Sequence, residues 1–128
     1  MNICTYLANK LLDHTLRNIP YTPPSTVYVA LLTADPTASG DTTNEVTDSA
    51  YARQALTFDE PVDRLTQTTY DVEFPQASED WGEITHVLLL DAETGGNPMF
   101  HGALNIAKTI TTDDIFRVPL GELTVRFD

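Results

Sequence analysis

Basic residues are scarce in this chain of 128 residues. Seven Lys and Arg stand against nineteen Asp and Glu, which gives a formal net charge of −12 and a pI near 4.3. A surface this acidic repels phosphate backbones and anionic lipid headgroups. The charge therefore predicts that neither nucleic acid nor a membrane is a partner.

Cysteine is nearly absent as well, since Cys4 is the only one. A single cysteine allows no intrachain disulfide and no thiolate-rich metal site. Its apolar neighbours indicate a buried, inert thiol. No basic region followed by an apolar run marks a secretory signal, and no apolar stretch has the length of a membrane-spanning helix. We therefore expect a protein that folds in the cytoplasm where it is made.

Residues 2–18 have the spacing of an amphipathic helix. Asn2 is placed to cap its first turn, Arg17 lies near its carboxyl end, and Pro20 prevents its continuation. Such a helix has to pack its apolar stripe on something, either the rest of the domain or a neighbouring protein. The stripe consists of Cys4, Leu7, Ala8, Leu11 and Leu12, with Thr15 extending it.

From residue 26 onward the pattern is typical of β-strands. Residues 26–33 and 84–90 are apolar on both faces, as in strands that are covered on each side. Residues 69–74 and 123–128 alternate between apolar and polar side chains, as in strands with one solvent-facing side. Residues 99–104 form the strand that follows 84–90 after a hairpin turn, and weaker strand candidates are 53–58, 107–111 and 115–120.

About eight short strands at regular spacing predict a mostly-β fold, either a single β-sandwich or a jelly-roll-like domain with one N-terminal amphipathic helix. The length suits one domain, so we expect residues 1–128 to form it, with the helix at 2–18 and the sandwich at 26–128. Gly95 and Gly96 supply the positive φ angles of a hairpin turn between two strands.

Residues 34–50 are polar, acidic and poor in bulky apolar side chains. This composition predicts a long surface loop that stays mobile unless a partner orders it. Asp41, Glu45 and Asp48 offer the hard oxygen ligands that calcium prefers. Their order does not match a recognised calcium loop, so a solvated acidic loop is the favoured interpretation and no metal ligand is predicted.

The chain shows no arrangement of residues typical of catalysis. His14, His86 and His101 are far apart in sequence and lack metal-ligand spacing, although the predicted hairpin places the last two opposite each other as a packing pair. Neither a glycine-rich phosphate loop nor a Gly-x-Ser-x-Gly elbow is present. Carboxylates are numerous enough for a paired-acid glycosidase site, but solvation accounts for most of them. We predict no catalytic residue, no cofactor-binding residue, no cofactor and no enzymatic activity.

Trp81 is the only tryptophan and precedes the apolar run 84–90. We interpret it first as closing one end of a sandwich core, and second as an interface anchor or a sugar-stacking platform.

Five segments carry a resemblance that covers nearly the whole chain. They are LANKLLDHTL (7–16), YTPPSTVYVALLTADPT (21–37), YARQALTF (51–58), VEFPQASEDWGEITHVLLLDAETGGNPMFHGAL (72–104) and LTVRFD (123–128). In this order and spacing they resemble a widespread family of small tailed-bacteriophage virion structural proteins, described as tail-fibre-like or head-decoration proteins.

The resemblance implies a virion protein, assembled in the bacterial host's cytoplasm, that works by contacts rather than by turnover. The first expectation is a capsid decoration (cement) protein, a homo-oligomer and specifically a trimer, that bridges subunits of the major capsid protein. The helix and loop 34–50 would be its docking elements. The alternatives are a tail-fibre, baseplate or neck module, which would contact other virion proteins, and a host-glycan-binding module that uses Trp81.

Overall fold

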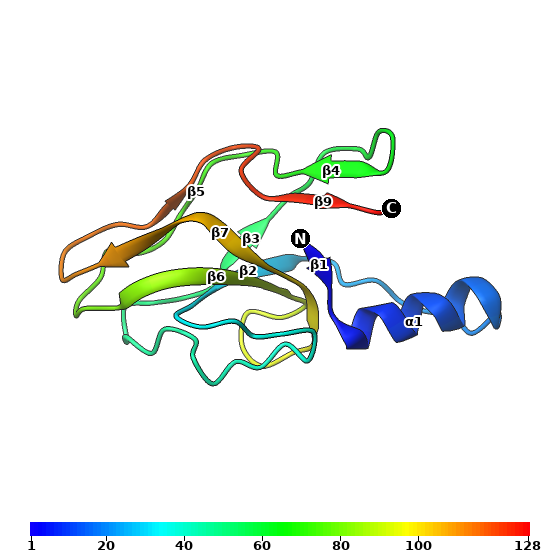
Figure 1. The fold of residues 1–128 in the computed structure, drawn as a ribbon, viewed down its shortest axis with the longest axis horizontal. Helices are drawn as coiled ribbons and strands as arrows, with labels where there is room; N and C mark the ends of the chain where they lie inside the picture. Colours follow the sequence, from blue (N-terminus) through cyan, green and yellow to red (C-terminus); the bar gives the residue numbers. More distant parts are fainter.

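The computed structural model describes residues 1–128 and is mostly β, with nine strands and one helix (Figure 1). The mostly-β class predicted from the sequence is confirmed. In chain order the elements are β1 (Asn2–Ile3), α1 (Thr5–Leu16), β2 (Val27–Leu32), β3 (Gln54–Leu56), β4 (Leu65–Gln67), β5 (Val72–Glu73), β6 (Gly82–Leu90), β7 (Pro98–Ile110), β8 (Arg117–Val118) and β9 (Thr124–Arg126).

Five strands form the main sheet, in the order β1-β7-β6-β2-β3, and all its pairs are antiparallel. β2 and β6 lie at its centre, and they are the two runs that the sequence shows as apolar on both faces. They pair from Tyr28 opposite Leu90 to Leu32 opposite His86. β2 and β6 are apolar on both faces because a buried hydrophobic cluster covers each face of these strands.

One face of the main sheet is covered by two separate ribbons, β4–β9 and β5–β8. Alternate side chains of the sheet interdigitate with side chains of the ribbons, which makes the arrangement sandwich-like. The main hydrophobic cluster unites Val29, Leu31, Val87 and Leu89 of the sheet with Val72, Phe74, Phe116, Val118, Leu123 and Val125 of the ribbons and their ends.

A second, smaller cluster lies on the opposite face of the sheet. It consists of Cys4, Ala30, Leu32, Leu88 and Leu90, all essentially inaccessible to solvent. Segment 36–40 lies next to the start of α1, where the backbone N–H of Thr5 donates to Ala38 O at 2.8 Å. Gly40, at φ +69°, approaches Pro98 so closely that an added Cβ would lie 2.1 Å from Pro98 Cβ.

The helix is shorter than the predicted 2–18, because the residues before it belong to the sheet. Asn2 and Ile3 form the edge strand β1 opposite β7 instead of a first helical turn capped by Asn2. The backbone N–H of Cys4 donates to Met99 O at 2.8 Å, and Cys4 is the N-cap without a side-chain capping bond. The spacing of apolar residues cannot reveal that residues 2–3 pair with β7. The predicted start of the helix was therefore wrong.

β7 joins two segments that the sequence predicts as separate strands. Its register on β6 shifts, since Ile84 lies opposite Lys108 whereas His86 lies opposite Ala103. Residues 104–107 therefore bulge from the ladder between them. A bulge of this kind lets the strand continue past a break in the apolar pattern, which explains why the pattern indicated two strands.

The same register corrects the predicted histidine pair. His101 lies opposite Leu88, not opposite His86. Two short elements, β1 and β4, were not predicted at all, because two or three residues are too few for a periodic pattern.

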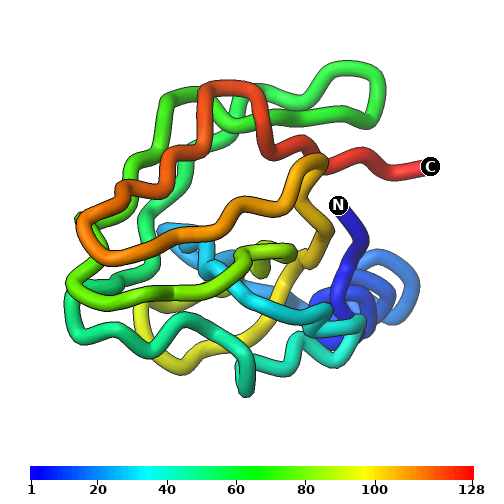
Figure 2. Tube along the Cα trace, turned by 60° about the vertical axis from the view of Figure 1, so that its left-hand side comes forward, coloured from blue at the N-terminus to red at the C-terminus, as the bar shows by residue number.

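The two ends of the chain lie side by side, next to the base of α1 (Figures 1 and 2). The amine of Met1 donates to Thr124 O at 3.1 Å. α1 projects from the body at this end, and the turn between β7 and β8 lies at the far end. α1 falls short of the length and apolar character needed to cross a membrane.

Candidate interaction surface

α1 buries the first part of its apolar stripe and exposes apolar side chains toward its carboxyl end. Leu7 is the only residue of the helix that is buried. Leu12, Leu16 and, just beyond the helix, Ile19 are exposed, and Leu16 retains 77% of its accessible surface. A 12-residue helix is marginal in water on its own, and packing of its apolar side normally stabilises it. The apolar side chains at the carboxyl end of α1 therefore form a surface that lacks a partner within the chain.

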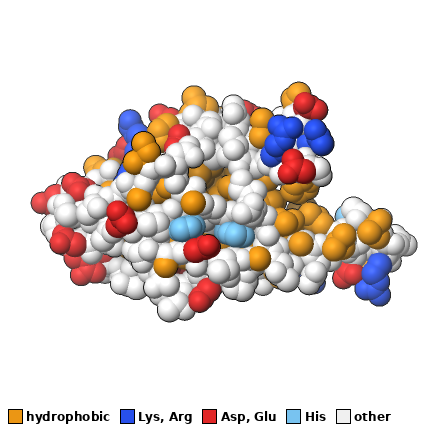
Figure 3. Space-filling model, in the orientation of Figure 1, with side chains coloured by type: hydrophobic (Ala, Val, Ile, Leu, Met, Phe, Trp, Pro, Cys, Tyr) orange, Lys and Arg blue, Asp and Glu red, His pale blue; other side chains and the backbone are white.

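A cleft of about 730 Å³ lies between α1 and the body. Leu11 and Leu12 of the helix line one wall, and Ile3, Phe100 and Phe127 contribute apolar surface on the other. The space-filling view shows hydrophobic side chains along the projecting helix and in the hollow where it meets the body (Figure 3).

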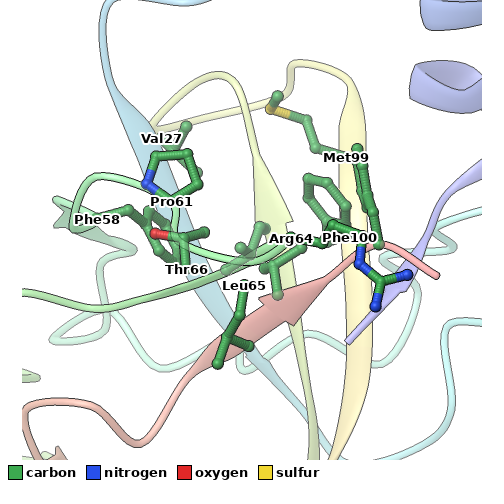
Figure 4. A pocket seen from close by; sticks show the side chains of 11 residues that line it. Val27, Phe58, Pro61, Arg64, Leu65, Thr66, Met99 and Phe100 are labelled. Carbon is green, nitrogen blue, oxygen red and sulfur yellow. The ribbon is translucent and has the colours of Figure 1, made fainter.

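A second hollow of about 380 Å³ adjoins the cleft, because Phe100 and Phe127 line both. It lies under the hairpin of residues 58–67, which contains β4. Phe58 and Pro61 flank it on one side and Met99 and Phe100 on the other (Figure 4). Eight of its eleven lining residues are hydrophobic, so water inside it gains few hydrogen bonds.

We call these features together the apolar end, comprising residues 1–24, 58–67 and 124–128 with Phe100. Its charge differs from the rest of the molecule. It holds four of the seven basic residues and five of the nineteen acidic ones, which leaves three basic and fourteen acidic residues elsewhere. In Figure 3 acidic side chains gather at the opposite end. The apolar end is thus nearly neutral, and the remainder carries nearly all of the net charge.

The sequence drew attention to α1 but not to the hairpin 58–67 or to Phe127. The available signal was the pair of exposed apolar residues Val62 and Leu65 among charged neighbours in EPVDRLT. Such a signal becomes meaningful only when the fold places the hairpin next to α1.

Loop 34–50 was expected to depend on a partner for order, and here the prediction was wrong. The carboxylate of Asp48 is buried and accepts hydrogen bonds from Ser78 N at 2.7 Å and Trp81 Nε1 at 2.8 Å, and from the hydroxyl of Ser78. Ala50 N also donates to it at 3.0 Å. These hydrogen bonds hold the pKa of Asp48 well below its usual range, and the bond from the Ser78 hydroxyl contributes most.

A buried ion pair fixes the same loop. Arg53 donates from Nε and Nη2 to the two carboxylate oxygens of Glu45, both at 2.8 Å. Its Nη1 donates to Ala92 O and Gly95 O in the β6–β7 turn. The hydroxyl of Tyr51 donates to Glu45 at 2.7 Å. The pKa of Tyr51 is raised mainly by burial and, to a smaller degree, by the negative charge of Glu45.

The three carboxylates considered for calcium are engaged separately. Asp48 bonds to residues around Trp81, Glu45 binds Arg53, and Asp41 accepts from the backbone and side chain of Thr43. No three His, Cys, Asp or Glu side chains lie together in a way that could hold a metal ion.

Trp81 is part of the core. Only 6% of its surface is accessible, and its ring meets Tyr51 edge to face at a centroid distance of 5.6 Å. A buried ring offers no platform for a sugar, so the observation behind the glycan-binding alternative is lost. Cys4 is likewise buried, and burial raises the pKa of its thiol to about 11, which disfavours a thiolate.

Fold and surface together define a sandwich-like β domain with one end that is apolar and weakly charged. None of the curated proteins matches the chain. Comparison with protein families matches residues 2–126 to the family described as Podophage GP4 fiber I protein gp80. The chain belongs to this family, and it is accordingly a structural component of a phage virion.

Proposed function

We propose that this protein is a non-catalytic module of a phage fibre that is mounted through its apolar end and directs its acidic end toward solvent. The observation that carries this proposal is the asymmetry between a nearly neutral apolar end and an acidic remainder. Exposed apolar side chains that gather at one end of a molecule favour a protein contact there. The strongly acidic end keeps neighbouring assemblies apart and away from the packaged genome.

The family description favours a fibre position over the capsid-surface position that the sequence led us to expect first. We further propose that the protein works as a homo-oligomer, specifically a trimer, in contact with other virion proteins. Closed cyclic assemblies are the common form of soluble homo-oligomers, and a fibre needs a repeated, symmetric attachment.

Copy number tests the position. Quantitative mass spectrometry of purified virions that contain this protein, normalised to the portal and major capsid proteins, should give a small number of copies in multiples of three. A cryo-electron microscopy map should place its density on a fibre. Hundreds of copies with density over the capsid surface would overturn the fibre proposal in favour of capsid decoration. Absence from purified virions would overturn both.

A further inference from the structure

Two elements of the apolar end project from the body and carry exposed apolar side chains. On α1, Leu16 is 77% exposed, and at the tip of the hairpin 58–67, Val62 is 73% exposed. In the hairpin, the backbone groups of Val62 and Leu65 bond to each other, at 3.0 and 3.1 Å, so the tip is a defined structure.

We infer that α1 of one copy packs against the hairpin 58–67 of the next copy. The inference rests on the proposed function to the extent that the protein works as an oligomer. It adds which surfaces meet: a ridge formed by Leu16 of α1 and by Ile19 just beyond it, and an apolar hollow beneath and beside the hairpin. The ridge and the hollow differ in shape, so the contact is head to tail.

Charge complementarity supports a second copy as the occupant. The ridge segment 5–19 carries Lys10 and Arg17 against Asp13, a net charge of +1. The hairpin carries Asp59, Glu60 and Asp63 against Arg64, a net charge of −2. Opposite potentials across a contact favour it and fix its orientation.

The remaining surface argues against other contacts between copies. It holds fourteen acidic and three basic residues, one of which, Arg53, is buried in its ion pair. Two copies that approach through any part of this surface bring like charges together. The apolar end is the part through which copies of this chain can meet without that cost.

The recess beside the hairpin has room for apolar side chains of the ridge. A helix of 12 residues is about 18 Å long and about 10 Å wide with its side chains. The cleft of about 730 Å³ and the adjoining hollow of about 380 Å³ form an apolar recess beside the hairpin. Filling this recess with the ridge of a second copy removes the exposed apolar surface of both partners from water.

Three single variants matched in exposure test the contact. Leu16→Gln changes the ridge, Val62→Gln changes the hairpin, and Ile106→Gln changes the bulge of β7, where the side chain is 75% exposed. We expect the first two to weaken self-association by about tenfold or more in sedimentation equilibrium, since each loses a buried aliphatic contact. Ile106→Gln should associate like the wild type. Circular dichroism verifies that all three keep the fold.

Mixing tests the head-to-tail arrangement. A ridge variant, Leu16→Gln with Ile19→Gln, and a hairpin variant, Val62→Gln with Leu65→Gln, should each be monomeric. An equimolar mixture should form dimers, because the intact hairpin of one variant accepts the intact ridge of the other. If the hairpin variant assembles like the wild type while the ridge variant does not, helices pair with helices and the inference is wrong.

The inference is also wrong if the wild type is monomeric at about 100 μM, a concentration at which a specific contact of this kind should be populated. That result would leave the copy-number test of the fibre proposal unaffected. The two proposals can therefore fail separately.

Discussion

At the scale of single residues, Asp48 organises the loop that precedes β3. Its carboxylate takes hydrogen bonds from backbone and side chains around residue 78 and from the indole of Trp81, about thirty positions along the chain. One acidic side chain thereby fastens an otherwise polar loop to the core. The loop is ordered by its own chain and needs no ligand for that purpose.

Acid should destabilise the protein through Asp48. Its pKa is lower in the folded than in the unfolded chain, where an Asp titrates near 4. The ionised carboxylate therefore stabilises the fold above about pH 4, and this stabilisation is lost as the pH falls further. Urea unfolding between pH 7 and pH 3 should show a steeper loss for the wild type than for Asp48→Asn, which is less stable at pH 7.

Glu93→Gln is a suitable control for this experiment, because it also removes one negative charge from an exposed position. Equal slopes for the wild type and Asp48→Asn would contradict the assignment of the acid sensitivity to Asp48.

Arg53 should matter far more to stability than an exposed arginine. Arg53→Ala leaves the half-buried Glu45 without its partner and frees two turn carbonyls, and removing one member of a buried ion pair typically costs about 3–5 kcal/mol. Arg117→Ala breaks an exposed pair with Glu73 at 3.3 Å and should cost about 0.5 kcal/mol or less. Equilibrium unfolding in urea measures both, and similar losses would contradict the structural role of Arg53.

Residue roles of this kind are beyond reach from the sequence. Asp48 looks like any acidic loop residue, and Trp81 allowed three interpretations. Their pairing depends on two segments that meet only in the folded chain. By contrast, the burial of Cys4 was predicted from its apolar sequence neighbours, although the residues that cover it, Ala30, Leu32, Leu88 and Leu90, come from β2 and β6.

At the scale of elements, strong patterns were read correctly and short or interrupted ones were not. β2 and β6 have long apolar runs, and the turn between β6 and β7 has two glycines at positive φ, Gly95 at 61° and Gly96 at 76°. The sequence therefore predicted the centre of the sheet. The N-terminal boundary of α1, the continuity of β7 and the existence of β4 depended on pairing partners that are distant in sequence.

α1 should be the least protected regular element in dilute protein. Leu7 is its only buried residue, so opening of the helix costs little beyond local contacts. In hydrogen–deuterium exchange by mass spectrometry, peptides of residues 5–16 should exchange much faster than peptides of β6. Raising the protein concentration into the associating range should slow α1 selectively. Protection of α1 equal to that of β6 in the monomer would contradict an unpartnered helix.

At the scale of the whole molecule, the uneven distribution of charge is the dominant feature. Composition gave the net charge of −12 but not its distribution. Four basic residues that are scattered in sequence converge at one end only in the fold. The functional class, a virion structural protein, came from the whole-chain resemblance and agrees with the family match to residues 2–126.

Low salt should weaken association between copies. At about 10 mM ionic strength charges act over roughly 30 Å, so the acidic remainders of two copies repel, whereas at 150 mM the range is roughly 8 Å. Sedimentation equilibrium should therefore give a dissociation constant several-fold higher at low salt. Tighter association at low salt would show that attraction between the ridge and the hairpin outweighs the repulsion of the acidic remainders.

The position of the chain ends has a practical consequence for labelling and display. The amine of Met1 is hydrogen-bonded to the carbonyl of Thr124, and both chain ends lie near the base of α1. A fluorescent protein or affinity tag fused to either end would crowd the surface through which we expect the module to be mounted. The turn between β7 and β8, where Asp113 already adopts φ 73°, lies at the far end. A foreign peptide inserted there would face outward on an assembled particle and leave the mount free.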